Sequence, residues 1–177
     1  MIIIGVDPGT IITGFGIVKY ENSKLSYLYS GIIKTPTTKE IPPRLESIYN
    51  ELTRLIKLYN PSQFAIETVF YNNNVQSILK IGYVRGISLL AAQQHKLEIN
   101  EYSPREIKKS VVGNGAASKE QVQFMIKKLL SLNIDFPKFD ESDAIAIAIC
   151  HAFKKDSLSH KSGSWKKFID ANPDKVL

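Results

Sequence analysis

The chain of 177 residues has a single cysteine, Cys150, and only three histidines. One cysteine excludes a disulfide framework and a C-x-x-C metal site. Because it follows the apolar run 144–149, we expect it to be a small buried side chain. No apolar stretch approaches the roughly 20 residues of a membrane span, and the apolar start lacks the basic segment of a signal peptide. These absences predict a soluble, cytoplasmic protein.

Acidic residues are outnumbered, since 23 Lys and Arg against 17 Asp and Glu give a net charge of +6. This excess favours a polyanionic partner such as nucleic acid. Hydrophobic residues make up 44% of the chain, which is typical of a globular protein. After residue 153 the composition becomes polar and basic, with a lone Trp165. We therefore predict one domain over 1–153 and a tail over 154–177 that need not be ordered.

The pattern of apolar residues and turn formers predicts both strands and helices. Strands are expected over 2–7, 13–20, 25–35, 64–69 and 97–102. Helices are expected over 44–59, 74–96 and 104–112, from 118 onward, and from 140 to about 153. The first three strands have short connections and should be antiparallel, whereas the later ones alternate with helices. The sequence thus predicts an α/β fold with a mixed five-stranded sheet covered by helices on both faces.

Four acidic residues end, interrupt or immediately precede apolar segments. Asp7 ends the first strand, Glu67 interrupts the strand 64–69, and Asp140 and Asp143 precede an almost wholly apolar helix. Each has an ordinary explanation as well: a turn at Asp7, a strand end reaching solvent at Glu67, and helix capping at the last pair. A carboxylate beside apolar residues is nevertheless costly unless something compensates it. Together the four indicate a bound cation.

The chemistry of these groups points to a hard divalent ion. Carboxylate oxygens with few histidines and no cysteine cluster suit Mg²⁺ or Mn²⁺ better than zinc. Two such ions about 3.5–4 Å apart can assist an in-line displacement at phosphorus. We therefore predict metal-dependent hydrolysis of a phosphodiester by water, leaving 5′-phosphate and 3′-hydroxyl ends, without a covalent enzyme intermediate.

Several short segments follow one another along residues 2–153. They are G-V-D-P-G-T with T-G-F-G, P-R-L at 43–45, F-A-I-E-T-V-F at 64–70, G-Y-V-R-G at 82–86, V-V-G-N-G-A-A-S-K at 111–119, and D-E-S-D-A-I-A-I-A at 140–148. In this order they resemble the RuvC family of crossover (Holliday) junction endodeoxyribonucleases. The segments 64–70 and 111–119 are the most specific. The resemblance implies a ribonuclease-H-like fold and symmetric cutting of four-way DNA junctions in recombination and repair.

The same resemblance implies roles for individual residues and for partners. The implied catalytic and metal-binding residues are Asp7, Glu67, Asp140 and Asp143. They would bind Mg²⁺, two ions per site, with Mn²⁺ able to substitute. The implied partners are junction DNA, a second copy of the chain, and branch-migration proteins of the RuvA and RuvB type.

Three further positions match residues of the family that contact DNA. Phe70 matches an aromatic residue that contacts unstacked bases, although it could also be a core side chain. Lys108 and Lys119 match lysines near the scissile phosphate, although surface lysines are usually just solvated. The chain departs from the family at 71–74, where asparagines replace a basic residue, and within 82–86. For Arg85 the sequence does not distinguish between a role in DNA contact and a role in packing.

Three other functions are weighed against this one. A ribonuclease-H-like nuclease for another branched DNA or RNA should differ over 111–119, where this chain matches the resolvases. The sugar-kinase and actin-like ATPases share D-x-G-T and a glycine-rich strand, but they need a second domain of similar size. A junction-binding protein without catalysis would not need all four acids.

Overall fold

The computed structural model describes residues 1–37, 40–68, 75–134 and 136–171, with side chains described up to residue 156. The strands are β1 (Ile2–Asp7), β2 (Ile12–Glu21), β3 (Lys24–Lys34), β4 (Gln63–Glu67) and β5 (Glu98–Tyr102). The helices are α1 (Ile41–Tyr59), α2 (Val75–Gln94), α3 (Pro104–Val112), α4 (Lys119–Leu129) and α5 (Phe139–Ala171). Every predicted strand and helix is present, with most ends within three residues of the prediction.

The strands form one sheet in the order β3-β2-β1-β4-β5. β1, β2 and β3 pair antiparallel, while β1 with β4 and β4 with β5 pair parallel. The tight turn between β2 and β3 has positive φ at Asn22 (50°) and Ser23 (58°). Turns of this kind match the twist of antiparallel strands. The predicted mixed sheet with three leading antiparallel strands is confirmed.

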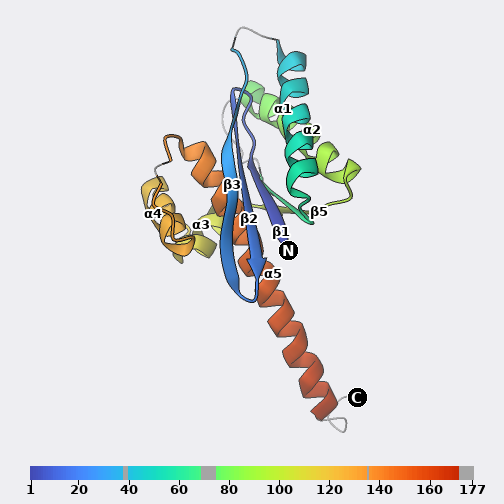
Figure 1. Ribbon diagram of the computed structural model, residues 1–177, viewed down its shortest axis with the longest axis vertical. Helices are drawn as coiled ribbons and strands as arrows, with labels where there is room; N and C mark the ends of the chain where they lie inside the picture. Colours follow the sequence, from blue (N-terminus) through green and yellow to red (C-terminus); the bar gives the residue numbers. More distant parts are fainter. Residues whose placement is uncertain (38–39, 69–74, 135, 172–177) are drawn as a thin grey trace.

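Helices cover both faces of the sheet (Figure 1). On one face α1 buries Ile48, Leu52, Leu55 and Ile56, at the spacing of a single helix face, in a core shared with α2. On the other face α3, α4 and the first half of α5 enclose a second core. No helix in the described ranges is both long and apolar enough to cross a membrane.

Glycines let α5 lie directly on β1 and β2. A Cβ at Gly14 would stand 1.9 Å from the carbonyl oxygen of Asp140, and one at Gly16 would stand 2.8 Å from Cα of Ile145. Real Cβ atoms essentially never come this close to a neighbour. Any larger residue would therefore push the helix away from the sheet. This close packing fixes the first turns of α5 at the end of β1.

Two expectations about α5 are wrong. The helix runs to Ala171 and extends beyond the body of the molecule (Figure 1), whereas the prediction ended it near Phe153. Apolar periodicity marks only the part of a helix that packs, and polar residues without proline can continue it. The helix also begins at Phe139, so Asp140 lies in its first turn rather than at its N-cap. The division into a domain and a tail remains a prediction.

Apolar residues recur along the helix predicted over 74–96, but only some of them are buried in α2. Val84 and Ala91 are buried, along with Ser88 and Ala92. In contrast, Val75, Leu79, Tyr83 and Leu90 are 59%, 54%, 51% and 50% exposed. A single copy of the chain therefore leaves a row of large apolar side chains in contact with solvent.

Candidate active site

A cavity of about 240 Å³ opens where β1 and β4 end, between the sheet and the helices α3, α4 and α5. Its lining combines three of the four predicted acids, both predicted lysines and an apolar floor. The lining residues are Asp7, Glu67, Pro104, Ile107, Lys108, Lys119, Val122, Asp143, Ala146 and Ile147. The predicted convergence of strand ends and the start of a helix is therefore present.

The strand register places Asp7 and Glu67 side by side. Each is the last residue of its strand, and β1 and β4 are parallel neighbours. Gly5 and Ala65, two residues earlier, are paired and face α5. Because side chains alternate along a strand, both carboxylates point to the same face. The two carboxyl groups therefore interact directly, and the charge of Glu67 raises the pKa of Asp7.

Helix α5 supplies the third carboxylate. Asp143 lines the cavity, one turn after Asp140. Asp140 is not among the lining residues, although its charge acts on Asp7, Asp143 and Lys119. Of the four predicted acids, three thus share the cavity and the fourth lies at its margin.

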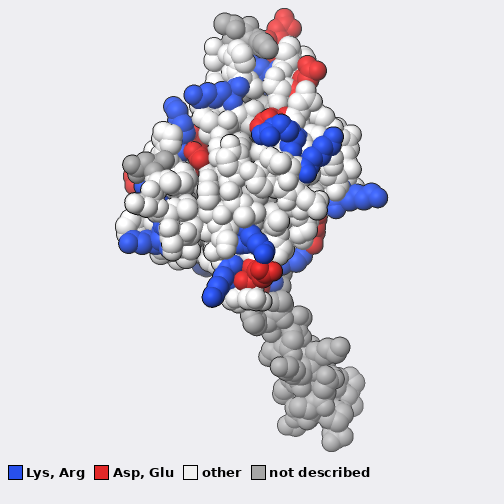
Figure 2. All heavy atoms as spheres, in the orientation of Figure 1, with Lys and Arg blue, Asp and Glu red and all other residues white. Residues whose placement is uncertain are grey.

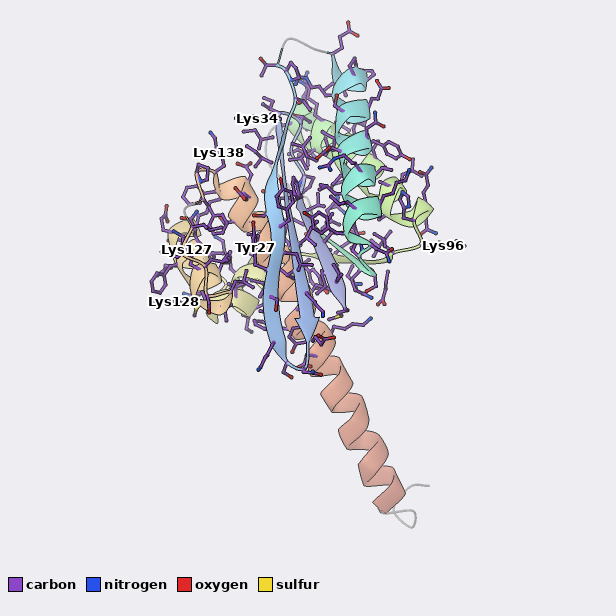
Figure 3. The ribbon with its side chains drawn as sticks, in the orientation of Figure 1. Tyr27, Lys34, Lys96, Lys127, Lys128 and Lys138 are labelled. Carbon is purple, nitrogen blue, oxygen red and sulfur yellow. The ribbon has the colours of Figure 1, made fainter. Side chains whose placement is uncertain are left out.

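A hydrogen-bonded pair anchors the first turn of α5 to the sheet. Ser30 on β3 is buried and donates from Oγ to Oε1 of Glu141 at 2.6 Å. The hydroxyl of Tyr27 (labelled in Figure 3) lies 3.0 Å from the same Ser30 Oγ. Glu141 could be suspected from the acidic segment 140–143, whereas no local pattern marks Ser30, a polar residue in the middle of a strand.

Burial and mutual repulsion make the three carboxylates hard to ionise. Burial raises the pKa of Asp7 well above its ordinary value, and the charges of Glu67 and Asp143 raise it further. Burial also raises the pKa of Glu67, although its hydrogen bond with Asp7 opposes this effect. The pKa of Asp143 is raised by burial as well, against the opposing effect of Lys119. A cation at this position would favour the ionised form of all three.

Lys119 provides part of the missing positive charge. Its Nζ lies 2.5 Å from Oδ2 of Asp143 and 5.7 Å from the centre of the Phe139 ring. Burial lowers the pKa of Lys119, but the bond to Asp143 and the charges of Asp7 and Asp140 raise it above its ordinary value overall. With Lys108, the cavity has two ammonium groups against three carboxylates, which leaves an excess of negative charge.

The donor set fits a hard divalent cation. Every acidic group that lines the cavity is a carboxylate, which is the ligand type that Mg²⁺ and Mn²⁺ prefer. As the side chains lie, no three Asp, Glu, His or Cys in the described ranges are arranged to hold a metal ion. Lys119 instead binds Asp143. The chemistry of the donors and their raised pKa values therefore carry the metal assignment, and a bound ion has to compete with Lys119.

Arg85 and Phe70 are the two other positions of interest. Arg85 forms an ion pair with Glu101, which favours packing over DNA contact. Phe70 falls outside the described residues, so its predicted contact with bases remains a prediction.

Comparison with known proteins gives consistent matches. The family model "Crossover junction endodeoxyribonuclease RuvC" matches residues 3–151. The protein of that name from Legionella pneumophila (strain Lens) is 46% identical over 163 residues, which cover 92% of this chain and 93% of the relative. The one from Alkaliphilus oremlandii is 49% identical over 153 residues, covering 86% and 93%. The structure of Thermus thermophilus RuvC in complex with a Holliday junction substrate superposes with a TM-score of 0.83 at 28% identity, covering 88% of this chain and 94% of that one.

Proposed function

The chain belongs to the RuvC family of crossover junction endodeoxyribonucleases, and on this basis we propose that it resolves four-way DNA junctions by metal-dependent hydrolysis. Its fold is the ribonuclease-H-like fold of that family. The observation that carries the mechanism is the meeting of Asp7, Glu67 and Asp143 with two lysines in one cavity.

The three carboxylates of the cavity would hold Mg²⁺, two ions per site, with Mn²⁺ able to substitute. Asp140, whose charge already acts on Asp7 and Asp143, adds negative charge at the margin and is the fourth ligand candidate. When bound, such ions activate the attacking water and stabilise the leaving oxygen of the phosphodiester. Both carboxylates have to be ionised to act as ligands, and their raised pKa values oppose this until a cation binds.

The lysines act on the phosphate. Lys108 and Lys119 line the cavity from α3 and from the first turn of α4. Ammonium groups there attract the DNA backbone and offset the charge that develops during cleavage. Lys127 and Lys128 on α4 and Lys138 before α5 lie along one side of the molecule (Figure 3). Basic side chains are spread over the face seen in Figure 2, as expected for a surface that follows DNA arms.

Two copies of the chain would pair through α2. Val75, Leu79, Tyr83 and Leu90 form an exposed apolar row on this helix. A Cβ at Gly82 or at Gly86 would meet no atom within 4 Å, so this part of the helix is open. Small residues four apart let a second helix approach closely while the large neighbours bury their surface. A two-fold dimer carries two active sites, which suits paired cuts in opposing strands of a junction with matching symmetry.

Shape selects the junction, since two sites held at a fixed separation fit a branched substrate better than a linear duplex. Phe70 would stack on an unpaired base at the crossover. Proteins of the RuvA and RuvB type, which move the branch point, are the expected partners by family.

Separating binding from cutting tests the role of the acids. Asp7→Asn should bind a synthetic four-way junction with near wild-type affinity and cut it at least about 1,000-fold more slowly, since a ligand of the catalytic ions is lost. Glu46→Gln, which neutralises an exposed acid on α1, is the matched control and should cut normally. Retained cleavage by Asp7→Asn would exclude its ligand role.

A further inference from the structure

A second cavity lies beside the active site. It has a volume of about 400 Å³ and is lined by Pro104, Arg105, Lys108, Asn114, Gly115 and Ala116. Pro104 and Lys108 line the active-site cavity as well. The second cavity, called the flanking cavity below, therefore adjoins the catalytic one at the first turns of α3.

The lining of the flanking cavity is cationic. It contains Arg105 and Lys108 and no carboxylate, whereas the catalytic cavity contains three. The catalytic cavity is therefore suited to cations, whereas the flanking cavity is suited to anions. A polyanion whose reacting phosphate lies over the carboxylates has its next charged group near this cavity.

Arg105 is the arginine of this chain that keeps its guanidinium available. The other three arginines each donate to a protein oxygen: Arg44 to the Thr37 carbonyl, Arg54 to Glu51 and Arg85 to Glu101. Arg105 is exposed and makes no ion pair with any residue in the described part of the chain. A free guanidinium at a cavity wall offers two parallel N–H donors, the arrangement that binds a phosphate in a bidentate manner.

The loop after α3 holds the stem of this arginine. A Cβ at Gly115 would lie 2.6 Å from Cγ of Arg105 and 3.4 Å from its Nε, so the glycine backbone packs flat on the side chain. The loop is itself fixed: Gly113 ends α3 with φ 83°, and Oδ1 of Asn114 accepts a hydrogen bond from the Ala116 amide at 3.0 Å. Holding the stem lowers the conformational entropy that the arginine loses on binding a ligand.

We propose that the flanking cavity binds a phosphodiester of the cleaved DNA strand, the one adjacent to the phosphodiester that is cut. Arg105 would be its main hydrogen-bond donor. This assignment rests on the proposed nuclease function and adds a second contact to it. Arg105 and Lys108 are three residues apart on α3, so they lie about 5–6 Å apart at Cβ. That separation is comparable with the spacing of successive phosphates in a strand. Lys108, shared by both cavities, would bridge the two phosphates.

Arg105→Ala and a matched control measure this contact. Arg105→Ala should weaken binding of a four-way junction about 10- to 100-fold, the range for a lost charge-assisted hydrogen bond, and should lower the salt dependence by about one phosphate contact. The loss should appear in KM, with kcat nearly unchanged. Arg105→Lys should recover part of the affinity. Lys57→Ala, which removes an exposed charge on α1, should match the wild type.

A neutral phosphate analogue locates the contact on the DNA. Methylphosphonate linkages are placed one at a time on either side of the cut site. At one position, the methylphosphonate should weaken binding by the wild type as much as the Arg105→Ala substitution does. The same methylphosphonate should not weaken binding by the Arg105→Ala variant any further. Gly115→Ala, whose Cβ displaces the arginine stem, should show the same pattern more weakly.

Two results would overturn the proposal: unchanged affinity of Arg105→Ala, or equal losses at every methylphosphonate position in both proteins. Binding is measured without divalent cations and cleavage separately. Failure of the wild type to cut junctions would therefore count against the nuclease function, while an affinity independent of Arg105 would count against the flanking contact alone.

Discussion

Alanine in place of Gly14 tests whether close packing of α5 on the sheet sets the geometry of the active site. Gly14 pairs with Asp7 across β1 and β2, and a Cβ there would stand 1.9 Å from the carbonyl oxygen of Asp140. Ordinary contact begins at 3.4 Å, so the first turn of α5 has to retreat by about 1.5 Å. The obstacle is helix backbone, so rotating a side chain cannot relieve it.

The expected loss follows from that displacement. Moving catalytic groups by about 1 Å costs roughly 100-fold in rate, and overpacking a core costs about 1–3 kcal/mol. We expect kcat for junction cleavage by Gly14→Ala to fall about 100-fold and the melting temperature to fall by about 2–12 °C. Affinity for the junction without divalent cations should fall less than kcat, because the contacts of Glu106 on α3 with α5, at Cys150 and Lys154, lie more than two turns after Asp140.

Gly31→Ala is the matched control. Gly31 lies opposite Phe15 on β2 and β3, where a new Cβ would come within 2.9 Å of the Phe15 Cζ atom. This contact is on the face away from α5 and involves the end of a side chain that can shift. The control should lose some stability and keep its kcat. Single-turnover cleavage of a labelled junction and thermal unfolding provide both readouts. A wild-type kcat for Gly14→Ala would show that the packing of α5 on Gly14 does not set the geometry of the active site.

Three further predictions concern charge and assembly. Asp7→Asn should raise the melting temperature of the metal-free protein by about 1–8 °C, the equivalent of about 0.5–2 kcal/mol. The reason is that the substitution removes a buried charge that is repelled by the other carboxylates. A lower melting temperature would contradict this. The pKa values of Asp7, Glu67 and Asp143 are raised. The metal-free protein should therefore lose stability as the pH rises from the ordinary carboxylate range through these raised pKa values. Cleavage, which needs the ionised carboxylates, should be lost as the pH falls through the same values. The midpoint on the acid side of the pH–rate profile should move to lower pH as the Mg²⁺ concentration increases. A midpoint that does not change with Mg²⁺ would show that these carboxylates do not bind the ion. The wild type and the control Lys57→Glu should sediment as dimers and Tyr83→Glu as a monomer. Equal masses for Tyr83→Glu and the wild type would exclude pairing through α2.

Local patterns were enough to predict the sheet and its helices. Alternating apolar residues and turn formers marked each strand, and the helix expected from 118 onward does start there, with Ser118 as the N-cap of α4 in a capping box with Gln121. The grouping of Asp7 and Glu67 also followed from sequence, since both end apolar strands. Those features depend on neighbours within a few residues, which a sequence displays directly.

Features that depend on distances between remote segments could not be predicted. Nothing local shows that Asp143 enters the cavity while Asp140 stays at its margin, because this depends on how α5 packs on Gly14 and Gly16. The same holds for the bond from Ser30 to Glu141, which joins residues 111 apart in sequence. The exposed row on α2 has the same apolar pattern as a buried face, and only the fold shows that a single chain leaves it uncovered.

The decisive measurement is single-turnover cleavage of a synthetic four-way junction, compared with a linear duplex of the same sequence at increasing Mg²⁺. We expect symmetric nicks in two opposing strands of the junction, cutting that depends on Mg²⁺, and little or no cutting of the duplex. Equal cutting of both substrates, or cutting that persists when divalent cations are removed by a chelator, would contradict it.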